Sequence, residues 1–339
     1  MNERYSRQIL FSAIGETGQE KLLQSRVLII GCGALGAAHA ETLSRAGVGF
    51  LRIVDRDFVE FSNLQRQTLF SESDAKEKLP KAVAANKRLA EINSEIEVEA
   101  VVADVNHSNI ENLIEDCDLI LDGTDNFQTR YLINDVCVKL KKTWIYGAAV
   151  SSYGVTMTII PNVTPCLRCI FEEMPGAGSS PTCDTAGVIQ PIISTISAVQ
   201  TTEALKILTG NFDKLHESLL QFDVWQNDWR KIKLGRPNAD CKTCGQRGFE
   251  FLEAENTEFS AVLCGRNAVQ ISPPKPTQID LLNLAEKLKN LGAVKQNEYL
   301  LRLTVGDFEL TVFQDARAII RGTDDVSVAR SLYAKVVGV

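Results

Sequence analysis

The stretch RVLIIGCGALGAAHAETLSRAGVGFLRIVDRD, residues 26–57, constrains the fold more than any other part of the chain. Its apolar runs predict buried strands over residues 27–30 and 50–54, and the small residues between them predict a helix over about 34–46. Gly31, Gly33 and Gly36 stand in G-x-G-x-x-G spacing where the first strand meets this helix. Two strands joined by a helix are normally parallel neighbours, so we expect a parallel sheet covered by helices.

Alternating strands and helices continue to about residue 150, and the pattern then changes. Alternation of apolar and polar residues from Gly154, and again over residues 218–234, predicts antiparallel strands with a turn at Asn227. Residues 189–210, between these strands, predict a long helix. The fold class is therefore α/β: a Rossmann-like, mainly parallel sheet continued by antiparallel strands.

The end of the chain predicts a second, smaller domain. The acidic stretch over residues 249–258 is typical of a linker. Residues 259–339 predict a strand, a helix, a hairpin, a further strand and a final helix, which together make a small α+β domain of unknown role. We therefore expect a nucleotide-binding domain over residues 1–248, a linker over 249–258 and the α+β domain over 259–339.

The composition excludes several classes of protein. The 339 residues suit about two domains, and 45% hydrophobic with 23% charged residues is typical of globular proteins. A net charge of −7 argues against a nucleic-acid partner, which selects for clusters of Lys and Arg. No apolar run reaches the roughly 18 residues of a membrane span, and the charged N-terminus is unlike a signal peptide. We expect a cytoplasmic protein without membrane contact.

The glycine spacing predicts a nucleotide site. The glycines allow phosphates to approach the backbone at a helix N-terminus, where free N–H groups and the helix dipole favour anions. Asp55 ends the next strand 19 positions after Gly36, where its carboxylate can accept from ribose hydroxyls. LILDGTDN, residues 119–126, predicts a further strand that ends at the same edge and brings Asp125 near the phosphates.

Two kinds of catalysis fit such a nucleotide site. One is hydride transfer with NAD, and the other is activation of a carboxylate with ATP. Hydride transfer usually needs a proton donor such as His, but we interpret His39, His107 and His216 as surface or packing residues on helices and loops. The sequence therefore favours the ATP-dependent reaction.

Activation with ATP requires cations around the phosphates and a metal ligand. In SNLQRQTLF, residues 62–70, amide side chains and the Arg66 guanidinium supply donors for a polyphosphate and for the departing pyrophosphate. Lys81 and Arg7 are further cations, and Asp125 is a carboxylate suited to Mg²⁺.

Four of the nine cysteines have metal-site spacing. Cys166-x-x-Cys169 and Cys241-x-x-Cys244 form two knuckles that suit a tetrahedral zinc–thiolate site, which would be structural because no coordination position stays open. Of the other cysteines, we interpret Cys32, Cys117, Cys137 and Cys264 as packing residues. A non-catalytic scaffold that binds zinc and nucleotide is the remaining alternative.

Several motifs in order make the chain resemble the MoeB/ThiF/HesA family of ubiquitin-activating-like adenylyltransferases. The resemblance covers about residues 1–247 and rests on RYSRQILF, GCGALG, DRDFVEFSNLQRQ, LPKAVAA, LDGTDNFQTRYLIN, PCLRC, TCDTAGVI and CKTCG.

The resemblance implies that the enzyme uses ATP to adenylate the C-terminal Gly-Gly carboxylate of a small ubiquitin-like sulfur carrier. By the same resemblance, Asp55 would hold the ribose, Asn63, Arg66 and Lys81 the phosphates, and Asp125 Mg²⁺ at the α-phosphate. It also implies a homodimer, in which Arg7 reaches into the partner's site.

The resemblance leaves the carrier and the acceptor thiol open. The carrier is of the MoaD type, for molybdopterin synthesis, or the ThiS type, for thiazole synthesis, with a slight preference for MoaD. Cys183 lies in a predicted loop over residues 172–187, and it is either an acceptor, as a thioester or an acyl disulfide, or a non-essential thiol. Since the tail carries only Cys264, in a predicted strand, we expect a separate sulfur donor such as a cysteine desulfurase.

Overall fold

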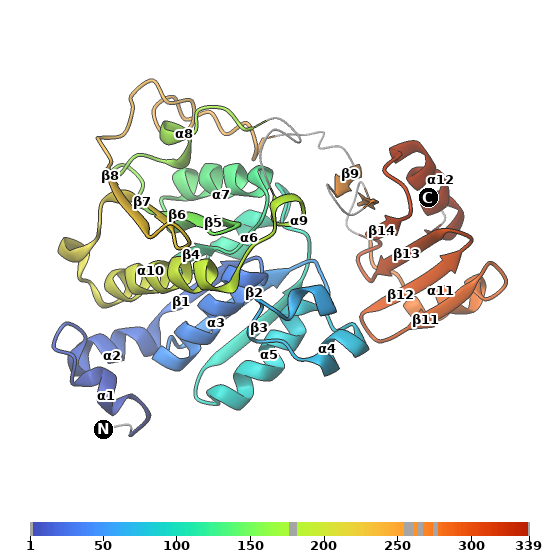
Figure 1. The fold of residues 1–339 in the computed structure, drawn as a ribbon, viewed down its shortest axis with the longest axis horizontal. Coiled ribbons are helices and arrows are strands. Elements are labelled where there is room, and N and C mark those ends of the chain that lie inside the picture. The colour runs from blue at the N-terminus through green and yellow to red at the C-terminus, as the bar shows by residue number, and fades with distance from the viewer. Residues whose placement is uncertain (1–2, 176–181, 254–259, 264–266, 274–276, 338–339) are drawn as a thin grey trace. The chain divides into compact units, whose positions relative to one another are not determined.

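The computed structural model describes residues 3–175, 182–253, 260–263, 267–273 and 277–337. The chain divides into two compact units, Met1–Ala254 and Glu255–Val339. Strands β1 to β8 belong to the first unit and β9 to β14 to the second (Figure 1).

The first unit is built on one eight-stranded sheet with the order β3-β2-β1-β4-β5-β6-β7-β8. The five strands β1 to β5 run parallel, and β6 to β8 are added antiparallel at one side. The predicted fold class is confirmed. The strands are β1 (Arg26–Ile30), β2 (Phe50–Asp55), β3 (Glu97–Val102), β4 (Leu119–Asp122), β5 (Thr143–Val150), β6 (Tyr153–Ile159), β7 (Ser218–Asp223) and β8 (Asp228–Lys233).

Helices cover both faces of this sheet (Figure 1). On one face α3 packs against α5 and α10, and on the other face α6 and α7 pack over the strands. The helices of the unit are α1 (Ser6–Ile9), α2 (Gly15–Gln24), α3 (Ala34–Ala46), α4 (Glu72–Glu77), α5 (Lys81–Ile92), α6 (Ile110–Ile114), α7 (Phe127–Leu140), α8 (Leu167–Ile170), α9 (Cys183–Ala186) and α10 (Gln190–Thr209), with short 3-10 turns η1 (Glu3–Tyr5), η2 (Phe61–Asn63) and η3 (Phe212–Lys214).

Local sequence explains where the principal helices begin and end. Helix α10 has Pro191 in its first turn, where no N–H partner is needed, and it ends at Gly210 with φ +88°. Helix α3 likewise ends at Gly47 with φ +81°. Helix α7 starts at Asn126, whose side chain accepts a hydrogen bond from Thr129 N–H. These ends fix the helices relative to the strand ends that form the site.

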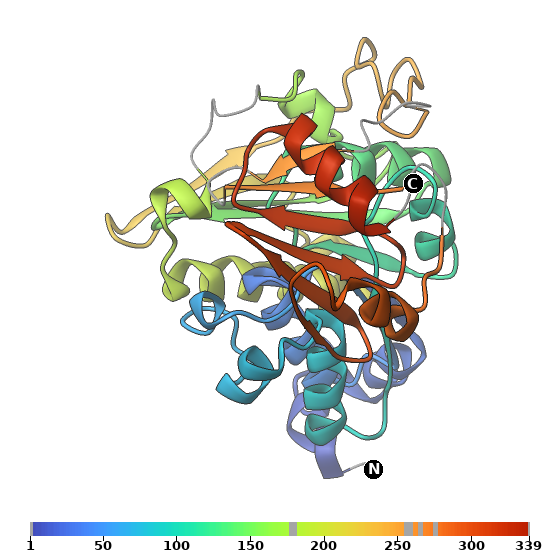
Figure 2. The same ribbon diagram turned by 90° about the vertical axis from the view of Figure 1, so that its right-hand side faces the viewer.

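The second unit is a six-stranded antiparallel sheet with two helices on one face (Figure 2). Its strands have the order β11-β12-β13-β14-β10-β9. Apolar residues of α11 and α12 pack on the sheet and make a core of its own. The elements are β9 (Ser260–Leu263), β10 (Ala268–Ile271), α11 (Leu281–Leu288), β11 (Ala293–Gln296), β12 (Leu300–Val305), β13 (Phe308–Phe313), β14 (Ala318–Arg321) and α12 (Val326–Val337).

The structure differs from the sequence expectations at the junction and in the second unit. Phe249 and Leu252, placed in the predicted linker, are buried in the core of the first unit, because their side chains pack near α7. The predicted single strand over residues 261–271 is a hairpin, β9 and β10, and the short strand β11 has no counterpart in the prediction. Cys264 lies outside the described residues, so its predicted packing role is untested.

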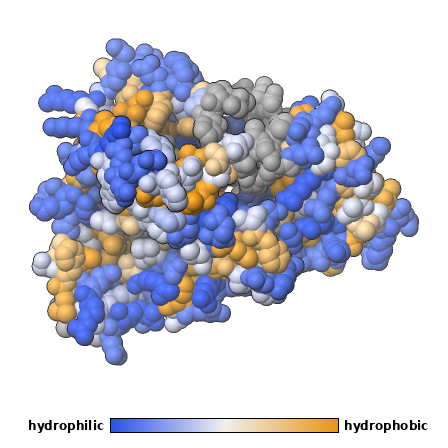
Figure 3. Space-filling view, in the orientation of Figure 1, coloured by the Kyte–Doolittle hydropathy of each residue, from blue (hydrophilic) through white to orange (hydrophobic). Residues whose placement is uncertain are grey.

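Hydrophobic side chains also reach the surface of the first unit. Figure 3 shows one face, on which hydrophobic patches are small and alternate with hydrophilic areas. The most exposed apolar residues of the first unit include Leu10, Phe11, Trp225 and Trp229. Among the described residues, no helix combines the length and apolar character that crossing a membrane requires.

Candidate functional site

The site is organised by three backbone segments in direct contact. Gly31, with φ +85°, follows β1, and its N–H donates to Val54 O over 2.8 Å. A Cβ on Gly36 would lie 1.8 Å from Gly31 O, and a Cβ on Gly123 would lie 2.5 Å from the same atom. Only glycine fits these positions, so the turn after β1, the start of α3 and the turn after β4 are held together.

The start of α3 is open to an anion. Gly33 is the residue before the helix, and it has no side chain that could cap the first turn. The first N–H groups of a helix have no partner within it, and the helix dipole makes this end positive. The predicted glycine turn therefore presents backbone donors at the carboxyl edge of the parallel strands, where α/β sheets bind ligands.

Asp55, predicted to bind ribose, lies at the end of β2 beside this turn. Its Oδ2 accepts from Cys32 N–H and its Oδ1 from Asp57 N–H, each over 2.6 Å. Burial raises the pKa of the Asp55 carboxyl, and the nearby Lys81 ammonium acts in the opposite direction. Each carboxylate oxygen keeps one lone pair for a ligand hydroxyl, so the fixed side chain suits the predicted role.

The cationic residues predicted from the sequence lie on elements around the same edge. Lys81 begins α5, is 6% exposed, and its Nζ lies 3.3 Å from Asp57 Oδ2. Arg66 is half-buried, and its Nη1 donates to Ser62 O over 2.9 Å. Asn63 is buried and holds the turn through its Oδ1, which accepts from the backbone N–H of residue 60 over 3.0 Å. Arg7 is exposed on α1, which packs against α2.

Asp125 follows the turn at Gly123 and is exposed. Its loop is held by a buried ion pair between Arg130 and Asp122. Arg130 Nε lies 3.0 Å from Asp122 Oδ2, and both side chains are buried. Arg130 Nη2 also donates to Thr124 O over 2.6 Å. The loop is therefore held while the Asp125 carboxylate faces solvent, as a metal ligand requires.

Sequence reasoning missed four charged residues of this edge: Arg56, Asp57, Asp104 and Arg130. Arg56 Nη1 pairs with Asp104 Oδ1 over 3.0 Å. Burial disfavours its charge, but Asp104, Asp57 and Asp125 outweigh burial and raise the pKa of Arg56. The sequence did contain a signal, because Arg56, Asp57 and Asp104 lie within two residues of the end of β2 or β3, and Arg130 lies in the first turn of α7. The edge thus balances several carboxylates against Arg56 and Lys81.

Cys183 is the first residue of α9, beside the end of β5. Its Sγ lies 3.5 Å from Ala149 O, and in the segment after α9 Val188 forms a bridge with Ser151, the residue that follows β5. Gln65 Nε2 donates to Val188 O over 3.5 Å, which connects this segment to residues 62–70. The predicted acceptor thiol therefore lies on the side of the sheet that carries the SNLQRQ segment.

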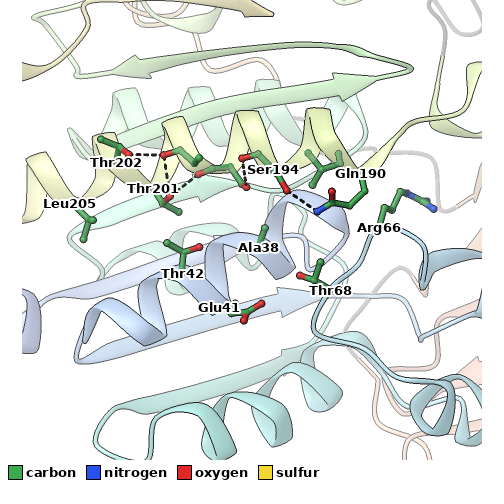
Figure 4. A pocket seen from close by; sticks show the side chains of 13 residues that line it. Ala38, Glu41, Thr42, Arg66, Thr68, Gln190, Ser194, Thr201, Thr202 and Leu205 are labelled. Carbon is green, nitrogen blue, oxygen red and sulfur yellow. Dashed lines mark hydrogen bonds between the residues drawn. The ribbon is translucent and has the colours of Figure 1, made fainter. Parts of the chain in front are cut away.

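A separate groove of about 460 Å³ runs between α3 and α10 (Figure 4). Thr201 and Thr202 line it with hydroxyls that donate to backbone oxygens of α10 itself. Of the residues predicted to bind nucleotide, only Arg66 is among the described residues that line this groove. The groove is therefore not the predicted nucleotide site, although it reaches the SNLQRQ segment.

The four knuckle cysteines come together as predicted. The Sγ–Sγ distances are 3.8 Å for Cys166–Cys169, 3.6 Å for Cys166–Cys241 and 3.3 Å for Cys169–Cys244, and all four sulfurs lie within 4.8 Å of one another. Four sulfurs bound to tetrahedral zinc at about 2.3 Å would be about 3.8 Å apart. The cluster therefore fits zinc with four thiolate ligands.

Two residues of helix α7 form hydrogen bonds with residues of the two cysteine knuckles. Asn134 Oδ1 accepts from Leu167 N–H over 2.9 Å, directly after the first knuckle cysteine. Asp135 accepts from Thr243 Oγ1 over 3.0 Å and from Phe251 N–H over 2.9 Å. Asn134 and Asp135 are fully buried. Sequence reasoning missed them because they lie on a helix far from either cysteine pair.

Comparison with known proteins agrees with this fold and site. A model described as the ThiF family matches residues 5–243. The sulfur carrier protein ThiS adenylyltransferase of Bacillus subtilis (strain 168) is 46% identical over 340 residues, covering 100% of each chain. The SAMP-activating enzyme E1 of Haloferax volcanii is 39% identical over 251 residues, covering 74% of this chain and 92% of that protein.

A solved structure of E. coli MccB with ATP shares the fold, with a TM-score of 0.63 at 23% identity, covering 72% of this chain and 74% of that chain. The fold and the glycine turn define a Rossmann-like protein, with the residues predicted for nucleotide binding on elements around the strand ends. The chain belongs to the ThiF family.

If the cysteine cluster binds structural zinc, removing one ligand should release the metal. We expect purified protein to contain about one zinc per chain, Cys241→Ser to contain almost none, and the variant to unfold at lower denaturant concentration, because metal binding contributes to folding. Mass spectrometry of the metal content and denaturant unfolding measure both effects. Cys117→Ser, away from the cluster, serves as the control; zinc retained by Cys241→Ser would contradict the assignment.

Proposed function

We propose that this protein is an ATP-dependent adenylyltransferase that activates the C-terminal Gly-Gly carboxylate of a small ubiquitin-like sulfur carrier. The backbone contact between Gly31 and Gly123 carries the proposal. This contact brings the turn that precedes Asp125 beside the start of α3, a helix end that favours phosphates. The names of the most similar relatives support the same activity.

In the proposed reaction a carboxylate oxygen of the carrier attacks the α-phosphorus of ATP. The bond from that phosphorus to the bridging oxygen breaks, and pyrophosphate leaves with the bonding electrons. The carboxylate is already a nucleophile, so no general base is needed, and positioning and charge neutralisation supply the catalysis. Asp125 would hold Mg²⁺, which supplies positive charge at the α-phosphate when bound.

Other residues of the chain would bind the ribose and the phosphates of ATP. Asp55, held by two backbone donors, would accept from the ribose. Lys81, Arg66 and Asn63 would bind the phosphates and the leaving pyrophosphate. Arg7, exposed on α1, would complete the site of the neighbouring subunit in a homodimer.

The two alternatives receive less support from the site. As a proton donor for hydride transfer, His39 is unsuited: it is fully buried, bonded to Gln200 over 2.9 Å, and burial lowers its pKa to about 4. His216 is also enclosed, with Nε2 3.5 Å from the buried Glu203. A non-catalytic scaffold would not need the full set of Arg66, Lys81 and Asp125.

We propose the ThiS type as the carrier. The Bacillus subtilis relative, named for ThiS, matches this chain over its whole length and therefore includes the second unit. The SAMP-activating relative matches 74% of the chain. This full-length agreement outweighs the slight preference for MoaD, which no motif supported. Sulfur would come from a separate donor such as a cysteine desulfurase.

Loss of a phosphate or metal residue should slow adenylation. We expect Arg66→Ala and Asp125→Ala each to reduce carrier-dependent ATP–pyrophosphate exchange by about 10²–10³. Arg66→Ala removes a positive charge that stabilises the transition-state phosphates, and Asp125→Ala removes the proposed ligand of the Mg²⁺ that would supply one. Arg88→Ala, on an exposed face of α5, is the control.

A mixture of variants tests the homodimer. Exchange should partly return when Arg7→Ala and Asp125→Ala subunits are mixed, since a mixed dimer contains one complete site. Exchange at the wild-type rate in Arg66→Ala or Asp125→Ala refutes the assignment.

The carrier is tested by comparing purified ThiS-type and MoaD-type proteins in the same exchange assay. We expect a higher kcat/KM with the ThiS type, because the surface that selects the carrier should be shared with the full-length relative. A carrier lacking the terminal Gly-Gly is the control and should give no exchange. Equal or faster exchange with the MoaD type would contradict the choice of a ThiS-type carrier.

Cys183 is proposed as the acceptor of the activated carrier. Its thiolate would attack the acyl carbon and release AMP, forming a thioester, with the thiol proton passing to solvent. Intact-mass analysis after mixing with carrier and ATP should show a covalent adduct that is cleaved by hydroxylamine and absent from Cys183→Ser. Cys117→Ser should retain the adduct, and an unchanged adduct in Cys183→Ser rules the role out.

A further inference from the structure

Two tryptophans of the β7–β8 hairpin are exposed although neighbouring groups hold them in place. Trp225 is 74% exposed and Trp229 is 64% exposed. The backbone N–H of Trp225 donates to Asp223 Oδ1 over 3.0 Å. The Trp229 ring packs at right angles to the Phe222 ring, with 5.0 Å between the ring centroids. Aromatic side chains that face solvent in a fixed position are typical of protein interfaces, because they bury much apolar area and lose little freedom on binding.

Trp229 lies in line with the part of β5 that contacts Cys183. In the register of the sheet, Ala149 of β5 is paired with Gly154 of β6. Gly154 is paired with Phe222 of β7, and Phe222 with Trp229 of β8. Directly paired residues have their side chains on the same face of a sheet. The Cys183 Sγ lies 3.5 Å from Ala149 O, so one row of residues across the sheet connects the thiol with the hairpin.

This row sets the distance between the hairpin and the thiol segment. β8 is three strands from β5, and neighbouring strands are about 4.8 Å apart, so Trp229 lies about 14 Å from Ala149. An extended chain spans about 3.3 Å per residue, so about five residues cover this distance. Ala149 and Phe222 share an apolar cluster with Val188, which follows α9. A carrier whose terminal carboxylate reaches Cys183 through an extended tail can therefore rest its folded body on the hairpin.

The strand that carries Trp229 is also basic. β8 is the outer strand of the sheet and contains the cations Arg230, Lys231 and Lys233. Its one carboxylate, that of Asp228, pairs with Arg230 over 2.5 Å. Side chains alternate along a strand, so Trp229 shares one face with Lys231 and Lys233, and both lysines are exposed. In a chain of net charge −7, this face favours a partner with acidic groups around an apolar patch.

Resting on the proposed function, we propose that the folded body of the carrier docks on this hairpin. The docking surface, called the Trp229 surface below, consists of Trp225, Trp229, Lys231 and Lys233. The partner that it fits is a small folded protein with an apolar patch bordered by Asp and Glu side chains. The indole rings pack on that patch and the lysines pair with its border. The tail then follows the row of paired residues toward Ala149 and the thiol.

A second copy of this chain fits the Trp229 surface less well. A two-fold contact between β8 strands would bring the lysines of one copy against those of the other, and like charges opposed across strands are destabilising. Lysine side chains on an outer strand also prevent such pairing of edges. An acidic partner meets neither obstacle.

The test measures KM and kcat for a ThiS-type carrier in the ATP–pyrophosphate exchange assay with full-length protein. We expect Trp229→Ala to raise the KM for the carrier roughly 10- to 100-fold, the range for loss of an aromatic anchor. The kcat and the calorimetric Kd for ATP should stay unchanged, because docking of the body adds binding and not chemistry. Lys231→Glu combined with Lys233→Glu should also raise the KM, and added salt should weaken carrier binding by the wild type but not by this variant.

Phe212→Ala is the matched control. Phe212 is 51% exposed in η3, before the start of β7, and therefore lies toward the opposite end of that strand from the hairpin turn. We expect this variant to keep the wild-type KM and kcat. A carrier without its terminal Gly-Gly isolates docking from chemistry: calorimetry should show it binding to the wild type and to Phe212→Ala, but not to Trp229→Ala.

The outcomes separate this inference from the proposed function. A wild-type KM in both Trp229→Ala and the double lysine variant overturns the inference, and so does a lower kcat at unchanged KM. If Trp229→Ala changes the oligomeric state in sedimentation, the surface is a contact between copies and the inference is wrong. If Trp229→Ala does not fold, the double lysine variant decides by the same KM criterion. A wild type that binds the truncated carrier but adenylates no carrier would refute the proposed function alone, while no carrier binding would refute both.

Discussion

The close approach of three backbone segments at Gly31, Gly36 and Gly123 determines the rest of the site. No side chain separates the end of β1, the start of α3 and the turn after β4, because a methyl group at Gly36 would lie 1.8 Å from Gly31 O. This is a steric constraint and not an attraction. It leaves the positive end of α3 open at the sheet edge and brings the turn that precedes Asp125 beside it. A larger residue at any of these positions would separate the glycine turn from the loop that carries Asp125.

Charge balance is the second property of the edge. Carboxylates at the ends of β2, β3 and β4 would repel a polyphosphate if they stood alone. In the structure Asp57 is paired with Lys81, and Asp104 with Arg56. Asp55 is held by two backbone N–H groups. The cations are therefore positioned before a ligand arrives, which lowers the cost of organising them around phosphate.

Helix α7 connects this edge with the cysteine cluster. Its first residue follows the Asn126 cap, next to Asp125, and its later turns carry Asn134 and Asp135, which bind backbone and side chains beside the two knuckles. The knuckles are 75 residues apart in the chain, so neither can position the other locally. The buried polar residues of one helix perform this task, and the ligands themselves lie in short turns.

The sequence by itself determined the βαβ start, the order of parallel and antiparallel strands, the cysteine cluster and the positions of Asp55, Lys81 and Asp125 at strand or helix ends. These features follow from local periodicity and from glycine or cysteine spacing, which act over a few residues. Only the tertiary structure decided that Arg56 pairs with Asp104 and that Asp122 and Arg130 support the Asp125 loop. It also decided that Phe249 and Leu252 pack into the first unit. Those relations join residues on different elements, and burial and side-chain pairing across elements leave no periodic pattern in the chain.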